Sequence, residues 1–209
     1  MNLDLGSVAA QMAWLALPVI FSGVFHMFVV KQRWLPRLAR PIDRGACFRG
    51  RRIFGDNKTW RGVVVMIGAG AIAGAVQGFF GGSALSDVSA LGAVWLVDTG
   101  PPGDAVPLGY ALQYGAAHAL FGLGYALGEL PNSFLKRQID IAPGKAGAGL
   151  LGAFFLLLDQ ADSVAACLLV GWMVFPLSGA LVLMSIASMT VLHLLLNAAL
   201  HRGGVRKNL

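Results

Sequence analysis

The spacing of the basic residues constrains this chain more than any other feature of its sequence. Of the 16 Lys and Arg, ten fall between positions 31 and 61. None occurs in residues 1–30, 62–135 or 146–201, and these stretches consist largely of apolar residues and glycine. A helix needs about 20 mainly apolar residues to cross the hydrocarbon core of a bilayer. We therefore predict an all-α integral membrane protein.

The apolar stretches predict about five transmembrane helices in a single membrane-embedded domain, residues 1–209. Charged residues make up 12 % of the chain, against roughly 25 % in soluble domains. We divide the last long apolar stretch into two spans near residues 175–179, and we expect the short apolar segment 91–97 at the membrane interface. The expected spans are about residues 9–30, 62–80, 108–128, 163–181 and 184–201.

The same charge pattern predicts the orientation of the helices. Loops rich in Lys and Arg stay on the cytoplasmic side, which places residues 31–61, 129–162 and the C-terminal tail in the cytoplasm. Residues 81–107 contain three Asp and no Lys or Arg, so we expect them outside. The prediction is a multi-pass protein of the cytoplasmic (inner) membrane whose two cytoplasmic loops form an active site that faces the cytoplasm.

The first loop contains the densest run of charge, FRGRRIFGDNKTWRG at residues 48–62. The basic residues directly after the first span are interpreted as a topology signal that also contacts anionic lipid head groups. The later segment GDNKTWRG adds Asp56, Asn57 and Thr59 to Lys58 and Arg61, and a topology signal needs none of these three. Asp56 can cap the following helix. A helix start with Lys, Thr and Arg beside it is suited to binding phosphate.

The second loop combines hydrogen-bonding and basic side chains. In ELPNSFLKRQ, Pro131 suits the first position of a helix. Such a helix would stack Asn132 with Lys136 and Ser133 with Arg137, four residues apart. Glu129 lies at the start of this loop. We expect its side chain to be solvated at the membrane interface, and we prefer this role to a contact with metal or ribose.

Two acids follow in LLLDQADSV, where Asp159 and Asp162 share one face of a helix. One interpretation is that Asp162 or Ser163 caps the fourth span, which leaves Asp159 unexplained. Hard oxygen ligands suit magnesium, and we predict that both acids bind Mg²⁺. The histidines inside apolar segments are assigned to neutral, hydrogen-bonded packing roles (His26, His118 and His193).

Three blocks, GDNKTWRG, NSFLKRQIDIAPG and DQADS, resemble the signatures of the CDP-archaeol synthase family in order and approximate spacing. These enzymes are membrane cytidylyltransferases related to phosphatidate cytidylyltransferase, and the similarity covers residues 40–175. The resemblance implies a five-span fold, CTP and magnesium as requirements, and a CDP-lipid as product. By position, the resemblance puts Lys58, Thr59 and Arg61 in the family's first block, Asn132, Ser133, Lys136 and Arg137 in its second, and Asp159 and Asp162 in its metal-binding block. We predict nucleotide and phosphate binding by Asp56, Asn57, Lys58, Thr59, Asn132, Ser133, Lys136 and Arg137. We predict catalytic roles for Lys58, Arg61, Lys136 and Arg137, and metal binding by Asp159 and Asp162.

These residues suit the attack of a lipid phosphate on CTP. The expected partners are CTP, a lipid phosphate of the phosphatidate type or the archaeal ether type, and the bilayer, with no nucleic acid. The sequence leaves open whether the chain acts as a monomer or a homodimer. Two other functions stay open, a CTP-dependent lipid kinase and a non-enzymatic protein that binds anionic lipids. The kinase would need a base for its alcohol, and the binding protein would not need the two aspartates.

Overall fold

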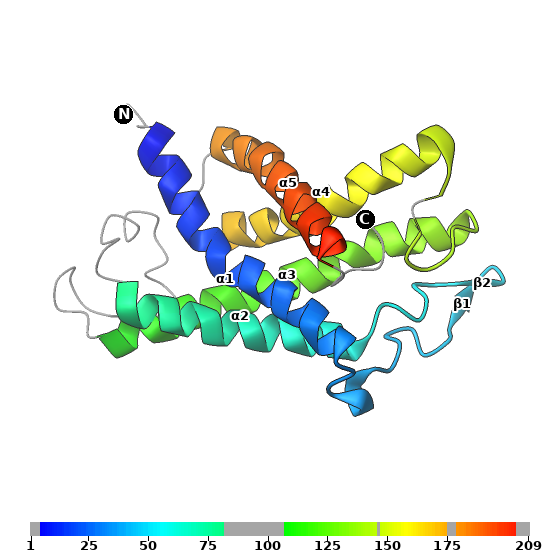
Figure 1. Cartoon of the computed structure of the whole chain (residues 1–209), viewed down its shortest axis with the longest axis horizontal. Helices are drawn as coiled ribbons and strands as arrows, with labels where there is room; N and C mark the ends of the chain where they lie inside the picture. Colours follow the sequence, from blue (N-terminus) through cyan, green and yellow to red (C-terminus); the bar gives the residue numbers. More distant parts are fainter. Residues whose placement is uncertain (1–4, 82–106, 146, 175–178, 204–209) are drawn as a thin grey trace.

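The structure is a computed structural model that describes residues 5–81, 107–145, 147–174 and 179–203, and most of this backbone is helical (Figure 1). Between α1 and α2 lie a 3₁₀ turn, η1 (Pro36–Leu38), and an antiparallel hairpin of β1 (Cys47–Phe48) and β2 (Arg51–Arg52). The helices are α1 (Leu5–Lys31), α2 (Trp60–Gly81), α3 (Pro107–Gln138), α4 (Gly149–Val174) and α5 (Gly179–Arg202). The prediction of an all-α fold with about five helices is confirmed.

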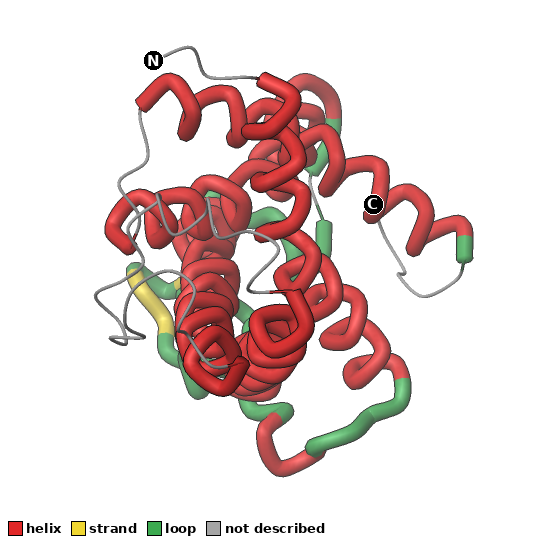
Figure 2. The backbone as a smooth tube through the Cα atoms, turned by 90° about the vertical axis from the view of Figure 1, so that its left-hand side faces the viewer, coloured by secondary structure: helices red, strands yellow, loops and turns green. Residues whose placement is uncertain are grey.

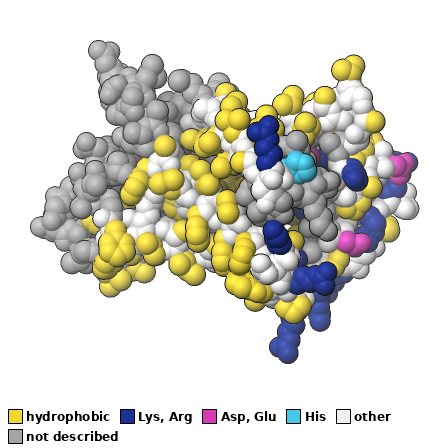
Figure 3. Space-filling view, viewed as in Figure 1, with side chains coloured by type: hydrophobic (Ala, Val, Ile, Leu, Met, Phe, Trp, Pro, Cys, Tyr) yellow, Lys and Arg dark blue, Asp and Glu magenta, His cyan; other side chains and the backbone are white. Residues whose placement is uncertain are grey.

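Three helices of the described chain are long and apolar enough to cross a membrane. They contribute the segments Ala13–Lys31, Trp60–Phe80 and Gly149–Met173, and α5 adds a shorter apolar stretch, Ser185–Ala199. In the space-filling view most Lys and Arg gather at the end that carries the hairpin, while hydrophobic side chains cover much of the helical surface (Figure 3). The chain is thus a membrane protein. The number and direction of its crossings stay predictions, and residues 91–97 and 175–178 lie outside the described residues.

The tightest packing in the molecule joins α2 to α3. These two helices run side by side along the long axis, α4 and α5 lie above them in Figure 1, and α1 crosses α2 (Figures 1 and 2). Glycines make the close approach feasible. A Cβ on Gly70, Gly74 or Gly78 of α2 would lie within 2.5 Å of a backbone carbonyl oxygen of α3. The sequence spacing of small residues is typical of such close-packed membrane helices.

α3 also positions α4, and glycine is again the reason. A Cβ on Gly128 of α3 would lie 2.4 Å from the Cβ of Ala166 and 2.9 Å from the carbonyl oxygen of Asp162. The missing side chain therefore lets the backbone of α4 approach α3 at the level of its acidic residues. α1 packs against α2, and α5 packs against α4.

The start of α4 differs from the prediction. The fourth span was expected to begin near residue 163, whereas α4 begins at Gly149, so Asp159, Asp162 and Ser163 lie in its interior. The idea that Asp162 or Ser163 caps this helix is wrong. Two carboxylates can lie inside an apolar helix because α3 supplies a cation and an amide to them, Lys136 and Asn132.

Two other helix starts also differ from the prediction. α3 continues through Pro131 without a break, so Pro131 is not a first helical residue. Proline is tolerated within membrane helices that pack against neighbours, and α3 packs against both α2 and α4. Asp56 does not cap α2, because its carboxylate pairs with Arg52. Thr59, directly before α2, accepts a hydrogen bond from the backbone N–H of Gly62 at 3.4 Å.

Candidate active site

The loop before α2 is organised around one buried acid, Asp43. Its carboxylate accepts hydrogen bonds from Arg52 at 2.8 Å and from the backbone N–H groups of Phe54, Gly55 and Gly45 at 2.9 to 3.1 Å. Burial by itself raises the pKa of the Asp43 carboxyl, but the hydrogen bonds from Arg52 and the backbone outweigh it and hold that pKa well below its usual range. These hydrogen bonds fix the loop, and the segment from Gly55 to the start of α2 follows directly from it.

The hairpin of this loop contacts the end of α3. Arg51 donates to the Asp140 carboxylate at 2.6 Å and to the carbonyl oxygen of Gln138, and the rings of Phe48 and Phe134 lie 5.8 Å apart. The two segments that the sequence places in separate loops therefore lie together. This arrangement agrees with the prediction that the loop before α2 and the segment from residue 129 lie close to each other.

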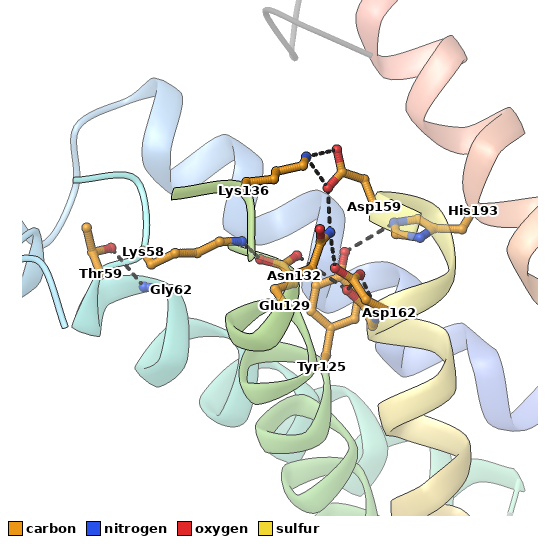
Figure 4. Close-up of polar contacts among 11 residues, drawn as sticks. Lys58, Thr59, Gly62, Tyr125, Glu129, Asn132, Lys136, Asp159, Asp162 and His193 are labelled. Atoms are coloured by element: carbon orange, nitrogen blue, oxygen red, sulfur yellow. Dashed lines mark hydrogen bonds and ion pairs between the residues drawn. The ribbon is translucent and has the colours of Figure 1, made fainter. Parts of the chain in front are cut away.

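Lys58 extends from the loop to Glu129 on α3, and the two side chains form an ion pair (Figure 4). The Glu129 side chain is 30 % exposed and that of Lys58 is 17 % exposed. The assignment of Glu129 to solvation at an interface is therefore wrong. Its carboxylate instead holds the Lys58 ammonium at the junction of the loop and α3.

The next turns of α3 face the two acids of α4. Asn132 Nδ2 lies 2.7 Å from Asp159 Oδ1 and 2.8 Å from Asp162 Oδ2, so one amide bridges both carboxylates. Lys136 Nζ lies 2.6 Å from each oxygen of Asp159. Ser163 donates to Asp162 at 3.0 Å and reaches Glu129 at 3.4 Å. Three acids and two lysines thus converge on one region of α3 and α4 (Figure 4).

Several buried polar atoms of α2 and α3 have no hydrogen-bond partner among the described residues. They are Nε and Nη1 of Arg137, Nε of Arg61 and Oδ1 of Asn132. Arg137 is only 7 % exposed and interacts electrostatically with Asp159, and its unpaired N–H groups are costly to bury unless a ligand accepts hydrogen bonds from them. The site therefore has spare hydrogen-bond donors suited to phosphate oxygens and a spare oxygen acceptor beside two carboxylates.

The oxygen atoms of Asp159, Asp162 and Asn132 are of the kind that binds a divalent cation. Two carboxylates and an amide oxygen are hard donors, and Mg²⁺ is commonly bound through one or two carboxylates with water or substrate completing its shell. Among the described residues no group of three or more His, Cys, Asp or Glu is arranged to hold a metal ion. Asp159, Asp162 and Asn132 nevertheless supply the donor chemistry that Mg²⁺ requires.

The structure does not bring all predicted site residues to this region. Asp56 is 77 % exposed and pairs with Arg52, and Asn57 is also exposed. Arg61 donates from Nη1 to the carbonyl oxygen of Trp34 at 3.1 Å. Ser133 is 7 % exposed and lies on α3 between Asn132 and Lys136.

Two histidines that the sequence assigned to packing lie at the site. His26 of α1 and His193 of α5 both interact electrostatically with the Glu129 carboxylate. His193 also bonds to Tyr125 of α3, at 3.1 Å from Oη to Nε2. No acid lies at helical spacing from either histidine, so only the tertiary packing could reveal these contacts. His118 is fully buried, with its ring nitrogens near the carbonyl oxygens of Tyr114 and Leu15, in agreement with a packing role.

Comparison with known proteins gives one consistent family. The CarS-like family model, described as CDP-archaeol synthase, matches residues 10–208. The CDP-archaeol synthase of Thermofilum pendens is 31 % identical over 93 % of this chain and 77 % of its own length. Those of Thermococcus onnurineus and Halobacterium salinarum are each 33 % identical, over 69 % and 80 % of this chain and 68 % and 81 % of their own. No solved structure matches significantly.

Proposed function

The chain belongs to the CDP-archaeol synthase family, and from this premise we propose that it is a cytidylyltransferase that transfers CMP from CTP to a membrane lipid phosphate. The relatives are named for the product CDP-archaeol. We therefore propose the phosphate of an archaeal ether lipid as the acceptor, ahead of a diacyl phosphatidate.

The observation that supports this function most strongly is the convergence of three sequence blocks at one cluster. Lys58 comes from the loop before α2, Asn132 and Lys136 come from α3, and Asp159 and Asp162 come from α4 (Figure 4). A protein that only binds anionic lipid would need the cations but no pair of carboxylates bridged by a buried amide. A polyanionic substrate that carries its own divalent cation needs both.

The proposed reaction needs no general base. An oxygen of the lipid phosphate would attack the α-phosphorus of CTP, and the bond from that phosphorus to the bridging oxygen of the β-phosphate would break. The products are a CDP-lipid and pyrophosphate. A phosphate monoester has a second pKa near 6, so its attacking oxygen is already ionised at neutral pH. The main obstacle is repulsion between two polyanions.

The residues of the site address this repulsion. Arg137 and Arg61 have unpaired N–H groups that would bind phosphate oxygens, and Glu129 holds the Lys58 ammonium at the junction of the loop and α3. Asp159, Asp162 and Asn132 would hold Mg²⁺, and Lys136 orients Asp159. When bound, Mg²⁺ supplies positive charge that stabilises the phosphate oxygens as negative charge develops on them.

Radiolabelled CTP tests the reaction class. Purified protein in detergent or vesicles is incubated with Mg²⁺, a lipid phosphate and CTP labelled at either the α or the γ phosphorus. We expect the α label in the lipid fraction and the γ label in pyrophosphate. A γ label in the lipid would identify a kinase, and no label in any lipid would leave only a binding function.

The acceptor is tested in the same assay with matched lipids. Archaeol phosphate and a diacyl phosphatidate of similar chain length are compared at equal surface concentration. We expect a higher kcat/KM for the ether lipid. An equal or higher value for the diacyl lipid would overturn the proposed acceptor and leave the cytidylyl transfer in place.

A further inference from the structure

Two polar side chains of α5 form hydrogen bonds with the turn of α4 that carries Asp159 and Asp162. His193 Nδ1 lies 3.0 Å from the backbone carbonyl oxygen of Gln160, and Asn197 Nδ2 donates to Gln160 Oε1 at 2.5 Å. Gln160 stands between Asp159 and Asp162 in the sequence and is fully buried. His193 and Asn197 are four residues apart, so they lie on one face of α5. One residue of α4 is therefore held through both its backbone and its side chain.

The same histidine joins α5 to α3. The Gln160 carbonyl can only accept a hydrogen bond, so His193 Nδ1 must donate to it. In a neutral imidazole Nε2 is then the acceptor, and it faces the hydroxyl of Tyr125 at 3.1 Å. Tyr125 precedes Glu129 by four residues on α3. Figure 4 shows Tyr125 and His193 beside the carboxylates. The chain of hydrogen bonds from Tyr125 through His193 to the Gln160 carbonyl thus connects three helices.

Packing alone does not require this arrangement. α5 is mainly apolar and packs against α4, and Leu or Val at position 193 would fill that interface without a polar group in the bilayer. Polar and ionisable side chains in membrane helices are costly and are usually retained for function. Here both hydrogen bonds end on Gln160, one of the two residues between the two proposed metal ligands.

We infer that His193, together with Tyr125 and Asn197, is a positioning residue that fixes the acid-bearing turn of α4 against α3. It keeps Asp159 and Asp162 directed at Asn132, and it touches neither substrate nor metal itself. This inference rests on the proposed function, because it assigns the fixed geometry to the binding of a divalent cation and CTP. Partners of metal ligands typically change metal affinity by about 10- to 100-fold when they are removed.

The test compares two substitutions of one residue. His193→Leu removes both hydrogen bonds, whereas His193→Asn keeps a donor near the position of Nδ1. His201→Leu, at the exposed end of α5, is the matched control. Binding of Mn²⁺ to the full-length protein is measured by electron paramagnetic resonance, and transfer from CTP is measured over a range of Mg²⁺ concentrations.

We expect His193→Leu to bind Mn²⁺ roughly tenfold more weakly and to need correspondingly more Mg²⁺ for half-maximal transfer. We expect His193→Asn to stay within about threefold of the unaltered protein, and His201→Leu to match it. The inference is overturned if His193→Leu binds Mn²⁺ like the unaltered protein, or if His193→Asn is no better than His193→Leu.

A double substitution keeps the test informative if His193→Leu does not fold. Asn at position 193 has no acceptor at the position of Nε2, so adding Tyr125→Phe to His193→Asn should cause little further loss, although Tyr125→Phe alone weakens Mn²⁺ binding. Additive effects would show that the two residues act independently and would overturn the inference. Protein that binds Mn²⁺ but transfers no CMP would refute the proposed function, while the Mn²⁺ measurements would still decide the positioning role.

Discussion

Arg52 and Arg137 show how differently two arginines of one loop–helix unit are used. Arg52 pairs with Asp43 at 2.8 Å and with Asp56 at 2.9 Å. Arg137 is buried, and its Nε and Nη1 have no partner among the described residues. Removing one member of an ion pair leaves its partner without a countercharge, whereas buried N–H groups without a hydrogen-bond acceptor already lower the stability of the fold. The two residues should therefore respond in opposite ways to the same substitution.

The first prediction follows from this contrast. Arg137→Met should keep or raise the thermal unfolding temperature and reduce cytidylyl transfer by at least about tenfold, because a contact to charge in a water-poor site is lost. Arg52→Met should lower the unfolding temperature, because Asp43 loses its cation. Unfolding is followed by tryptophan fluorescence and transfer by the labelled-CTP assay. A loss of stability in Arg137→Met equal to that in Arg52→Met would contradict the ligand-binding role.

The second prediction concerns the acids of α4. Asp159→Asn and Asp162→Asn keep the size of the side chain and remove its negative charge. Both variants should insert normally and lose nearly all transfer, since a hard divalent cation binds weakly when an anionic ligand becomes neutral. Asp140→Asn, at a side chain that is 70 % exposed, is the control and should transfer like the unaltered protein. Asp variants that keep more than about a third of the transfer at ordinary Mg²⁺ would show that the carboxylates are structural.

At the scale of single residues, the sequence predicted neighbours along one helix better than contacts with side chains on other helices and loops. The stacking of Asn132 with Lys136 and the shared face of Asp159 and Asp162 follow from helical spacing, which is local. The pairing of Lys58 with Glu129 joins residues 71 positions apart, and no local pattern indicates it. His193 was missed for the same reason, because its partners come from two other helices.

Among the elements, α2 and α3 are positioned by the glycines between them. In α2 a Cβ on Gly74 would lie 2.5 Å from the Tyr114 carbonyl oxygen and 2.7 Å from His118 Nδ1. A Cβ on Gly68 would meet nothing within 4 Å. The backbone of α3 cannot move away at Gly74 without losing contacts along the whole helix pair.

The third prediction uses this pair as a matched comparison. Gly74→Ala should destabilise the protein by about 1–3 kcal/mol, as is usual when a close-packed interface is overfilled. Gly68→Ala should be neutral or slightly stabilising, because alanine has the higher helix propensity. Both are measured as shifts of the thermal unfolding temperature in one detergent. Equal shifts in the two variants would show that the α2–α3 contact is looser than the structure has it.

The loop before α2 is a second element whose stability can be tested, through pH. The pKa of the Asp43 carboxyl in the folded protein lies well below its unfolded value of about 3.9. A lowered pKa stabilises the fold above the unfolded pKa, and this stabilisation is lost as the pH falls further.

The fourth prediction is that Asp43→Asn lowers the unfolding temperature at pH 7 and flattens its dependence on pH. The unaltered protein should lose stability as the pH falls below about 4, and the variant should lose less over that range. Asp140→Asn is again the control, since its exposed pair with Arg51 contributes little. Parallel curves for the unaltered protein and Asp43→Asn would mean that the carboxylate does not hold the loop.

The end of α3 and the start of α4 were the least predictable boundaries of these elements. The span boundaries were placed where charges begin, and this rule holds for α2, which starts at Trp60. It fails for the end of α3 and the start of α4, because Lys136 of α3 pairs with Asp159 of α4 and Asn132 donates to both acids across the helix interface. Charged residues inside a helix pair cannot be told from loop residues without knowledge of the partner helix.

For the molecule as a whole, the charged end and the cluster of site residues coincide. The hairpin, the start of α2 and the end of α3 lie at one end of the bundle (Figure 1), and the space-filling view shows Lys and Arg gathered there (Figure 3). CTP is a water-soluble polyanion and the acceptor is held in the bilayer, so a site at the polar end of a membrane bundle can receive both. The sequence could predict this arrangement because Lys and Arg are concentrated in the segments between the apolar stretches, and this pattern extends over the whole chain.

The last prediction tests the side of the membrane on which this end lies. Single cysteines are placed at positions 56 and 140, whose side chains are exposed in the loop before α2 and directly after α3, and at position 98 in the acidic segment, on a background without Cys47 and Cys167. The excess of Lys and Arg around the site predicts a cytoplasmic location. A membrane-impermeant maleimide should therefore label position 98 in intact cells and label positions 56 and 140 only after permeabilisation. Labelling of all three from the same side would refute the predicted topology, and labelling of 56 and 140 in intact cells would place the site away from cytoplasmic CTP.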